Sequence, residues 1–283
     1  MIDLHSHSNR SDGVKAPHEL AEAASLSGLS AIALTDHDTV DGTGEFLKAC
    51  DGLDGMTGIA GVEFSAESER GTLHILGLGL DASNTPLCEA LERIREGRDE
   101  RNRRILARLN ELGYALTWEE VESFAGGDVM GRPHFARAMI ARGWAESIAE
   151  VFERFLGRGA PAHVERFRPS PEEAITLIKG AGGVASIAHP VSWSMDYDFM
   201  RDELRRFMGF GLDAIECYHP RVGTKARASL LALADELGLL VTAGSDFHGI
   251  DGDDVLGAPD GAPDSLLAPL LGRMSPYGIS KAR

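Results

Sequence analysis

The sequence predicts an α/β protein in which a parallel sheet forms a closed or distorted (β/α) barrel, interrupted by an all-helical insertion. Short apolar segments alternate with amphipathic helical segments near both ends of the chain, as in folds built from βα units. Between them, the sequence shows helical periodicity without an evident strand. Polar clusters rich in histidine follow nearly every predicted strand, where α/β proteins place their chemistry. The barrel is therefore assigned to residues 1–85 and 170–283, and the insertion to residues 86–169.

The individual elements follow from local pattern and from residues that favour helix ends. Apolar and β-branched runs predict strands, and Pro17 stands at a favourable first-turn position of the first helix. The predicted strands are 1–7, 29–34, 58–64, 72–80, 183–188, 213–217 and 239–243. The predicted barrel helices are 17–27, 44–50, 171–180, 198–207 and 224–237, and the predicted insertion helices are 86–112, 118–124, 133–142 and 147–156.

The composition indicates a soluble protein with a full hydrophobic core. Hydrophobic residues make up 43% of the 283 positions, no apolar run is long enough to cross a membrane, and no signal peptide is evident. Cys50, Cys88 and Cys217 are widely spaced, which predicts free thiols in a reducing, cytoplasmic setting. The net charge of −16 argues against duplex nucleic acid or a membrane as a partner. Residues 251–254 are interpreted as a solvated acidic loop.

The first predicted strand supplies the first candidate metal ligands. His5 and His7 lie two apart, which places both imidazoles on one face of a strand. Asp12 follows, and the turn expected at Gly13 could fold its carboxylate back toward them. A His-x-His pair alone is a weak motif, and two unrelated surface histidines are an equal alternative. The number of similar fragments downstream decides between the two interpretations.

Nine histidine and carboxylate side chains fall at or near the ends of predicted strands. Burying them without cations would cost several kcal/mol for each unpaired group. Ligation by His, Asp and Glu without cysteine favours Mn²⁺, Fe²⁺ or Zn²⁺, and so many ligands suit two or three ions that share a carboxylate. A single strand-end histidine more often bonds a backbone carbonyl, and His18 and His163 are interpreted as structural histidines. The nine candidates are His5, His7, Asp12, His37, Glu63, His74, His189, Asp246 and His248.

These candidates lie in motifs that resemble the PHP (polymerase and histidinol phosphatase) family. The resemblance covers residues 1–80 and 170–260, in the order of the family. It implies a distorted (β/α)₇ barrel with a trinuclear metal site, often manganese, that hydrolyses phosphoesters. The motifs are His5-Ser6-His7-Ser8 with Ser11-Asp12-Gly13, Thr35-Asp36-His37-Asp38, Gly61-Val62-Glu63-Phe64-Ser65, Ala188-His189-Pro190 and Ser245-Asp246-Phe247-His248.

The resemblance also implies how the ligands divide among three ions. Clustered divalent cations lower the pKa of a bridging water and neutralise phosphoryl oxygens, so no side-chain nucleophile is required. Glu63 and Asp246 are expected to be essential for catalysis, and Asp36 and Asp38 are interpreted as loop caps or partners of ligands. The first ion is expected on His5, His7, Glu63 and Asp246, the second on Glu63, His74 and His189, and the third on Asp12, His37 and His248.

Arginine in the insertion predicts recognition of an anionic substrate. Residues 87–168 contain as many Asp and Glu as Arg and no Lys, whereas the rest of the chain is acidic. Arg101 and Asn102 lie on the long predicted helix, and Arg132 and His134 open another, a favourable place for an anion. A solvated helix face for the first pair and a loop salt bridge for the second are the structural alternatives.

The insertion, with Gly131-Arg132-Pro133-His134, resembles one PHP subgroup that acts on nucleotides. The resemblance implies removal of the 3′-phosphate from 3′,5′-bisphosphonucleosides such as adenosine 3′,5′-bisphosphate, or degradation of short RNA from a phosphorylated 5′ end. Insertion residues would hold the 5′-phosphate while the 3′ ester faces the metals. His219, after a predicted strand, is expected to contact phosphate or to protonate the leaving oxygen, and a structural histidine is an equal alternative.

Two competing classes of function receive less support. Hydrolysis of histidinol phosphate or of a C–N bond would not need an arginine-bearing insertion, and no lysine is placed as an obvious carbamate ligand. A non-catalytic PHP module would be expected to have lost ligands, whereas all nine positions are filled. The hypothesis is therefore a trinuclear, manganese-preferring phosphohydrolase of 3′,5′-bisphosphonucleosides, with some activity on short RNA.

Overall fold

The structure, a computed structural model, describes all residues except 126–129, 251–254, 260 and 281–283. The predicted acidic loop at 251–254 thus lies outside the described residues. The chain divides into two compact units. Met1–Leu91 and Arg168–Arg283 form the first, the barrel unit, and Glu92–Phe167 form the second, the helical unit. The predicted insertion is slightly longer than the helical unit at both ends.

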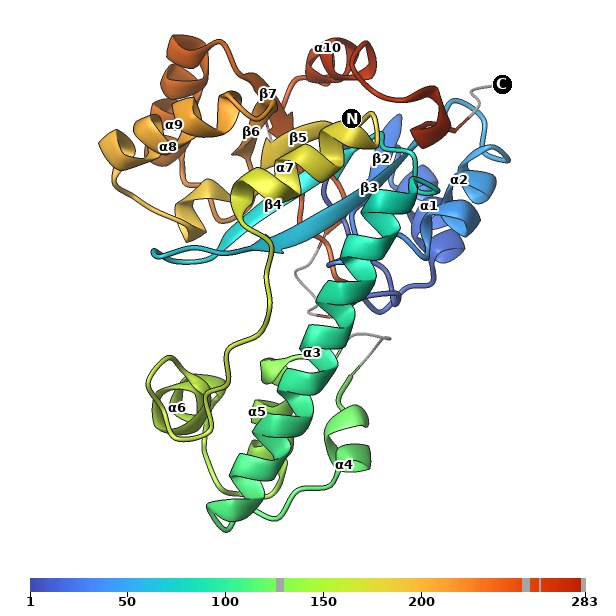
Figure 1. Ribbon diagram of the computed structural model, residues 1–283. Helices are drawn as coiled ribbons and strands as arrows, with labels where there is room; N and C mark the ends of the chain where they lie inside the picture. Colours follow the sequence, from blue (N-terminus) through green and yellow to red (C-terminus); the bar gives the residue numbers. More distant parts are fainter. Residues whose placement is uncertain (126–129, 251–254, 260, 281–283) are drawn as a thin grey trace. The chain divides into compact units, whose positions relative to one another are not determined.

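The barrel unit contains a seven-stranded sheet that curves into a nearly closed barrel (Figure 1). The strands neighbour one another in the order in which they occur along the chain. The segment after β1 lies beside β7, because Leu4 N donates to Ala243 O at 2.9 Å and Ser6 forms a parallel bridge with Phe247. The strands are β1 (Ile2–Asp3), β2 (Ala31–Leu34), β3 (Thr57–Ala66), β4 (Leu73–Leu78), β5 (Val184–Ile187), β6 (Leu212–Tyr218) and β7 (Leu240–Ala243).

The sheet is parallel as predicted except at β4, which runs antiparallel to both β3 and β5. Only residues 67–72 connect β3 to β4, and a parallel crossover needs about a dozen residues or more. The two strands therefore form a hairpin, with Ser65 opposite His74. Because β4 is reversed, its first residues lie at the same end of the barrel as the carboxyl ends of the parallel strands.

Apolar side chains fill the opposite end of the barrel interior. Ile2, Ile59 and Leu78, from three different strands, belong to one buried cluster with Leu270 of α10 (Leu267–Leu271). All four of these side chains are almost inaccessible to solvent. The polar residues are thereby confined to the other end, where the strands' carboxyl ends meet.

The remaining helices of the barrel unit pack on the outside of the sheet. Leu20 of α1 and Phe46 of α2 share a buried cluster with Ile32 of β2, and Figure 1 shows these two helices side by side. Short 3₁₀ turns occupy Pro190–Ser192, Asp264–Leu266 and Pro276–Gly278. The helices are α1 (Pro17–Leu26), α2 (Thr43–Cys50), α7 (Pro171–Gly180), α8 (Tyr197–Met208) and α9 (Thr224–Leu237).

The described residues of the helical unit form helices and loops without a strand. Their own buried cluster includes Ile105, Leu109, Phe135 and Met139. The predicted helix over 147–156 is two elements, a short α-helix followed by a π-helix. The elements are α3 (Thr85–Glu111, which begins in the barrel unit), α4 (Trp118–Glu122), α5 (Arg132–Ala141), α6 (Ile148–Val151) and the π-helix Phe152–Leu156. Among the described residues, none of the helices combines the length and apolar character needed to span a membrane.

Candidate metal centre

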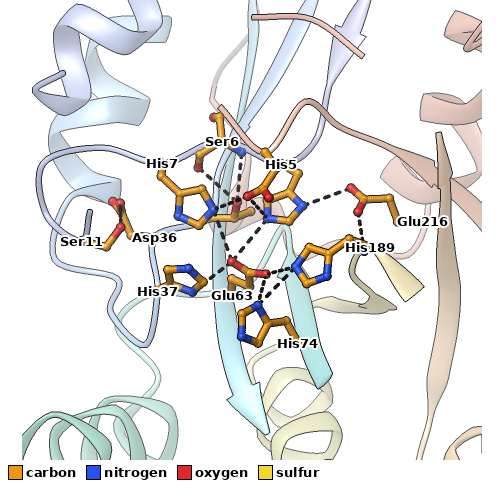
Figure 2. A network of polar contacts seen from close by, with 12 residues as sticks. His5, Ser6, His7, Ser11, Asp36, His37, Glu63, His74, His189 and Glu216 are labelled. Atoms are coloured by element: carbon orange, nitrogen blue, oxygen red, sulfur yellow. Dashed lines mark hydrogen bonds and ion pairs between the residues drawn. The ribbon is translucent and has the colours of Figure 1, made fainter. Parts of the chain in front are cut away.

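Four of the predicted ligands converge at the polar end of the barrel. Figure 2 shows three of them, His5, His7 and Glu63. His5 and His7 follow β1, Glu63 projects from β3, and Asp246 follows β7. The Nε2 atoms of His5 and His7 lie 3.4 and 3.3 Å from Glu63 Oε2. The same two atoms lie 3.3 and 3.2 Å from Asp246 Oδ1. These donor atoms lie within 4.8 Å of one another, so a single cation could contact all four.

The other carboxylate oxygen of Glu63 faces a second pair of imidazoles. Glu63 Oε1 lies 2.8 Å from His74 Nδ1 and 3.0 Å from His189 Nε2, and these two nitrogens are 3.2 Å apart. His74 reaches this point from the start of the reversed strand β4, and His189 from the loop after β5. The fully buried Glu63 thus links two groups of nitrogen donors.

Asp12 gathers the remaining predicted ligands. Its Oδ1 lies 3.2 Å from His248 Nε2, and its Oδ2 lies 3.8 Å from His37 Nε2. His7 Nδ1 lies 3.8 Å from the Oδ1 of Asp12, and the other ring nitrogen of His37 lies 3.0 Å from Glu63 Oε2. The structure therefore brings all nine predicted ligands together, and their role in binding metal stays a prediction.

Hydrogen bonds to Asp36 hold the loop between His7 and Asp12. The carboxylate of Asp36 accepts from Ser8 N at 2.8 Å, from Ser8 Oγ at 2.6 Å and from Ser11 Oγ at 2.6 Å. Asp36 is buried, and hydrogen bonds from the loop occupy both of its carboxylate oxygens. The side chain therefore orients the loop and does not point at the centre (Figure 2). This contact set agrees with its interpretation as a loop cap.

Backbone strain is concentrated at the centre. Asp38, His189 and Asp246 have positive φ angles of 54°, 26° and 58°, and no other non-glycine residue among those described does. Such conformations cost about 1–3 kcal/mol each and persist where neighbouring contacts enforce them. Asp38, for example, accepts hydrogen bonds from Ser65 N at 2.9 Å and Ser65 Oγ at 3.1 Å.

Burial and the charges of neighbouring side chains together shift the pKa values of these groups. Burial lowers the pKa of His7, but the nearby carboxylates of Asp246 and Glu63 raise it by more, to about 10. Burial raises the pKa of Glu63, yet the positive charges of His37 and its neighbours hold that pKa well below its usual range. Burial lowers the pKa of His74 to about 4, so this imidazole offers an uncharged nitrogen at neutral pH.

The donor atoms fit a divalent metal ion. His5 Nε2, both ring nitrogens of His7 and Glu63 Oε2 are buried and have no hydrogen-bond partner. Buried polar atoms are normally satisfied, so His5 Nε2, His7 Nε2 and Glu63 Oε2, which face one another without a hydrogen bond, fit a bound cation better than a packed core. Imidazole and carboxylate donors without sulfur suit Mn²⁺, Fe²⁺ or Zn²⁺.

His219 lies at the edge of this centre and is almost fully buried. Its Nδ1 accepts a hydrogen bond from Arg221 N at 3.0 Å, which leaves the proton of a neutral ring on Nε2. Nε2 lies 3.4 Å from Asp246 Oδ2. The structure thus places His219 next to a predicted ligand with a proton on the ring nitrogen that faces it.

The four predicted substrate residues of the insertion all lie in the helical unit. Asn102 is fully buried and donates to Met130 O at 2.9 Å, and Arg101 is 5% exposed. Arg132 donates to Leu156 O at 3.3 Å. The contacts of His134 are of the same local kind, since its Nδ1 accepts from the backbone N–H of Gly131 at 2.9 Å. Their predicted contacts with substrate stay predictions.

The two histidines interpreted as structural have local partners outside the set of nine. His18 Nδ1 is 2.5 Å from Glu45 on the surface. His163 contacts Leu156 O at 3.0 Å through Nδ1 and Glu165 at 3.0 Å through Nε2. Each imidazole is therefore explained by local contacts.

Sequence reasoning missed two buried carboxylates beside the centre. Glu216, on β6, lies 3.1 Å from His5 Nδ1, and Asp3, on β1, accepts from Ser245 N at 2.9 Å and Ser245 Oγ at 2.6 Å. Both are completely buried. An acidic residue inside an otherwise apolar predicted strand is the signal that could have identified them.

Comparison with known proteins assigns the family. The PHP domain family matches residues 3–164. A 3′,5′-nucleoside bisphosphate phosphatase of Chromobacterium violaceum is 35% identical over 90% of this chain and 90% of its own. A 5′-3′ exoribonuclease of Haemophilus influenzae is 34% identical over 87% of this chain and 89% of its own. The solved structure of an amidohydrolase from Chromobacterium violaceum, with bound sulfate and no metal, has a TM-score of 0.85 and 34% identity and covers 96% of both chains.

The fold, the histidine and carboxylate cluster and these matches agree with one another. The matched family segment contains six of the nine clustered residues, and the similarity to the relatives extends over most of the chain. The chain therefore belongs to the PHP domain family and is a metal-dependent phosphoesterase.

Proposed function

We propose that this protein removes the 3′-phosphate from 3′,5′-bisphosphonucleosides and releases the nucleoside 5′-monophosphate. The observation that carries the proposal is the complete set of nine clustered donors in a chain 35% identical to a phosphatase named for that substrate. A binding module without catalysis would have no need for so many buried, mutually coupled donors.

The proposed cofactor is manganese, as three ions held by three donor sets, two of which share Glu63. Ions of this kind supply an activated water at neutral pH and neutralise the oxygens of the phosphoryl group. Glu63 would contribute one oxygen to each of two sites, which its opposed contacts with His7 and His74 support. The proposed sets are His5, His7, Glu63 and Asp246; Glu63, His74 and His189; and Asp12, His37 and His248.

His219 is the proposed proton donor in this reaction. Its Nε2 carries the proton of the neutral ring and lies beside Asp246, next to the place where a phosphoryl group would bind. From there it can donate to a phosphoryl oxygen or to the departing 3′ oxygen. Asp246 accepts from His219 and so orients the ring.

Recognition of the 5′-phosphate is assigned to the helical unit. Arg132 and His134 occupy the first turn of α5, where the helix dipole favours an anion. The Arg132 guanidinium also lies over the Phe152 ring, which restricts its orientation. Arg101 and Asn102 are the other residues proposed to serve this recognition.

A second candidate is degradation of short 5′-phosphorylated RNA from its 5′ end. The 34% identity to a 5′-3′ exoribonuclease favours it, and the same 5′-phosphate recognition would serve both substrates. Hydrolysis of histidinol phosphate or of a C–N bond has weaker support, because neither substrate would use the arginines of the helical unit.

The decisive experiment measures phosphate release by the Mn²⁺-reconstituted protein. Adenosine 3′,5′-bisphosphate, histidinol phosphate and a short 5′-phosphorylated RNA are compared at equal concentration. Rapid conversion of the bisphosphate to adenosine 5′-monophosphate is the expected result. Turnover of histidinol phosphate alone would discard the assignment of the helical unit, and no turnover with metal bound would overturn the proposed function.

A further inference from the structure

Glu216 is a buried carboxylate that the nine-residue donor set does not include. It lies on β6 and is inaccessible to solvent. Its Oε1 lies 3.1 Å from His5 Nδ1, and its Oε2 accepts the backbone N–H of His189 at 2.6 Å (Figure 2). One side chain therefore contacts two of the residues proposed to bind metal.

The contact with His5 determines which ring nitrogen faces the centre. A neutral imidazole carries one proton, and a carboxylate at hydrogen-bond distance from Nδ1 places that proton on Nδ1. The lone pair is then left on Nε2, which lies 3.4 Å from Glu63 and 3.3 Å from Asp246. Carboxylate partners of this kind orient metal-binding histidines and increase their basicity.

The contact with His189 restrains a strained backbone. His189 has a φ of 26°, outside the range that most residues adopt. The hydrogen bond from its N–H to Glu216 helps to enforce this conformation, which directs Nε2 to within 3.0 Å of Glu63. Without Glu216, the backbone could relax and withdraw the imidazole.

We propose that Glu216 is a positioning residue that sets the His5 tautomer and the His189 backbone, and thereby the metal affinity of the two sites that share Glu63. The inference rests on the proposed function only in placing metal at this centre. A further ion on Glu216 itself is disfavoured, because both of its oxygens already have partners and His219 Nδ1 accepts from the backbone.

The test compares Mn²⁺ binding by the metal-free wild type, Glu216→Gln and a control, Asp213→Asn. Glutamine keeps the shape and can accept from one of the two donors, but its NH₂ group cannot accept from the other. Asp213 lies on the same strand, β6, but its carboxylate contacts Lys179, Arg273 and the backbone N–H of Ala185, none of which is a proposed ligand. Calorimetric titration should show about 10–100-fold weaker Mn²⁺ binding at two of three sites in Glu216→Gln. The third site, and all sites in Asp213→Asn, should retain wild-type affinity.

Several outcomes would overturn the proposal. The first is that Glu216→Gln binds Mn²⁺ with wild-type affinity at every site. The second is that both variants bind Mn²⁺ equally weakly at every site. The third is that the wild type binds four Mn²⁺ ions and Glu216→Gln binds three. If Glu216→Gln does not fold, a measurement on the wild type alone tests the proposed tautomer of His5. In protein labelled with ¹⁵N at histidine and loaded with Zn²⁺, the His5 Nδ1 resonance should show an attached proton, and a bare Nδ1 would refute the inference.

The same samples separate this inference from the proposed function. Wild type that binds Mn²⁺ but does not hydrolyse adenosine 3′,5′-bisphosphate would refute the proposed function and leave the role of Glu216 intact. Wild type that hydrolyses the bisphosphate while Glu216→Gln binds Mn²⁺ with wild-type affinity would refute the role of Glu216 and leave the proposed function intact.

Discussion

Asp246 contacts both histidines that follow β1 and also His219, so its carboxylate lies between the proposed ligands and the proposed proton donor. Replacing a group that only orients a metal ligand lowers metal affinity or activity by about 10–100-fold, so loss of the ligand itself should lower activity by more. We expect Asp246→Ala to reduce phosphate release from the bisphosphate by more than about 100-fold. Asp235→Ala, an exposed position on α9, is the control and should leave the rate unchanged.

Arg132 tests the assignment of the 5′-phosphate. A hydrogen bond to a charged group contributes about 1.5–3 kcal/mol, so Arg132→Ala should raise KM by roughly 10–100-fold with little change in kcat. Arg158, 79% exposed at its side chain, provides the matched control. A fall in kcat at unchanged KM for Arg132→Ala, with the opposite pattern for Asp246→Ala, would reverse the assigned roles.

His7 predicts how metal binding responds to pH. Its pKa in the metal-free protein is raised to about 10, so the ring is protonated at pH 7 and must lose that proton before it can bind a cation. Mn²⁺ affinity should therefore rise with pH, by up to about tenfold per unit below that pKa for each proton displaced. Calorimetry in buffers of different ionisation enthalpy measures the released protons. Affinity that is independent of pH, with no proton release, would contradict this expectation.

At the scale of elements, helix ends were the most predictable features. The Oγ of Ser170 accepts from Glu173 N at 3.2 Å, and a Glu173 oxygen accepts from Ser170 N at 2.8 Å, with Pro171 in the first turn. Gly238 ends α9 in the left-handed conformation with a φ of 68°. These signals are local, and both α7 and α9 have the predicted limits.

The cap of α7 gives a prediction for stability. Ser170→Ala removes the side-chain acceptor and should lower the free energy of unfolding by about 1 kcal/mol, within a range of roughly 0.5–2 kcal/mol. Urea denaturation of the metal-free protein measures the change. Ser229→Ala, on the exposed face of α9, is the control and should be neutral or slightly stabilising. Equal destabilisation by both substitutions would show that the cap has no special role.

Features that depend on tertiary neighbours were not predictable in the same way. Hydrophobic periodicity gives no strand direction, so the reversal of β4 became evident only from its pairing. The π-helix Phe152–Leu156 has the same apolar spacing as an α-helix over one turn. Glu216 escaped notice because its partners, His5 and His189, are distant in sequence. Eight of the nine clustered residues were found because they belong to short local motifs, and His74 was found because it lies in a predicted strand.

At the scale of the whole molecule, each of the two units has a buried apolar cluster of its own. The helical unit's cluster draws only on residues 105–164, and the two clusters described in the barrel unit include none of these residues. All nine clustered donors belong to the barrel unit. The division of labour in the proposed function therefore follows a physical division in the chain.

A deletion variant tests this division. Gly97 and Phe167 lie side by side, since a Cβ at Gly97 would be 3.3 Å from Phe167 Cβ, so a short Gly-Ser linker can replace residues 98–166. We expect the shortened protein to bind as much Mn²⁺ as the full chain and to hydrolyse p-nitrophenyl phosphate at a similar rate. Its KM for adenosine 3′,5′-bisphosphate should rise at least as much as in Arg132→Ala. Loss of Mn²⁺ binding would show that the barrel unit depends on the helical unit.

The closure of the barrel between the segment after β1 and β7 also has a consequence for biosynthesis. Asp246 and His248, which complete the donor sets of His5 and His7, follow them by more than two hundred residues and so emerge from the ribosome much later. A nascent chain therefore holds its early histidines, with Asp12 and Glu63, well before the last donors are present. Metal capture by the complete proposed donor sets, and the hydrolytic activity that depends on it, would follow only after the segment beyond β7 has docked.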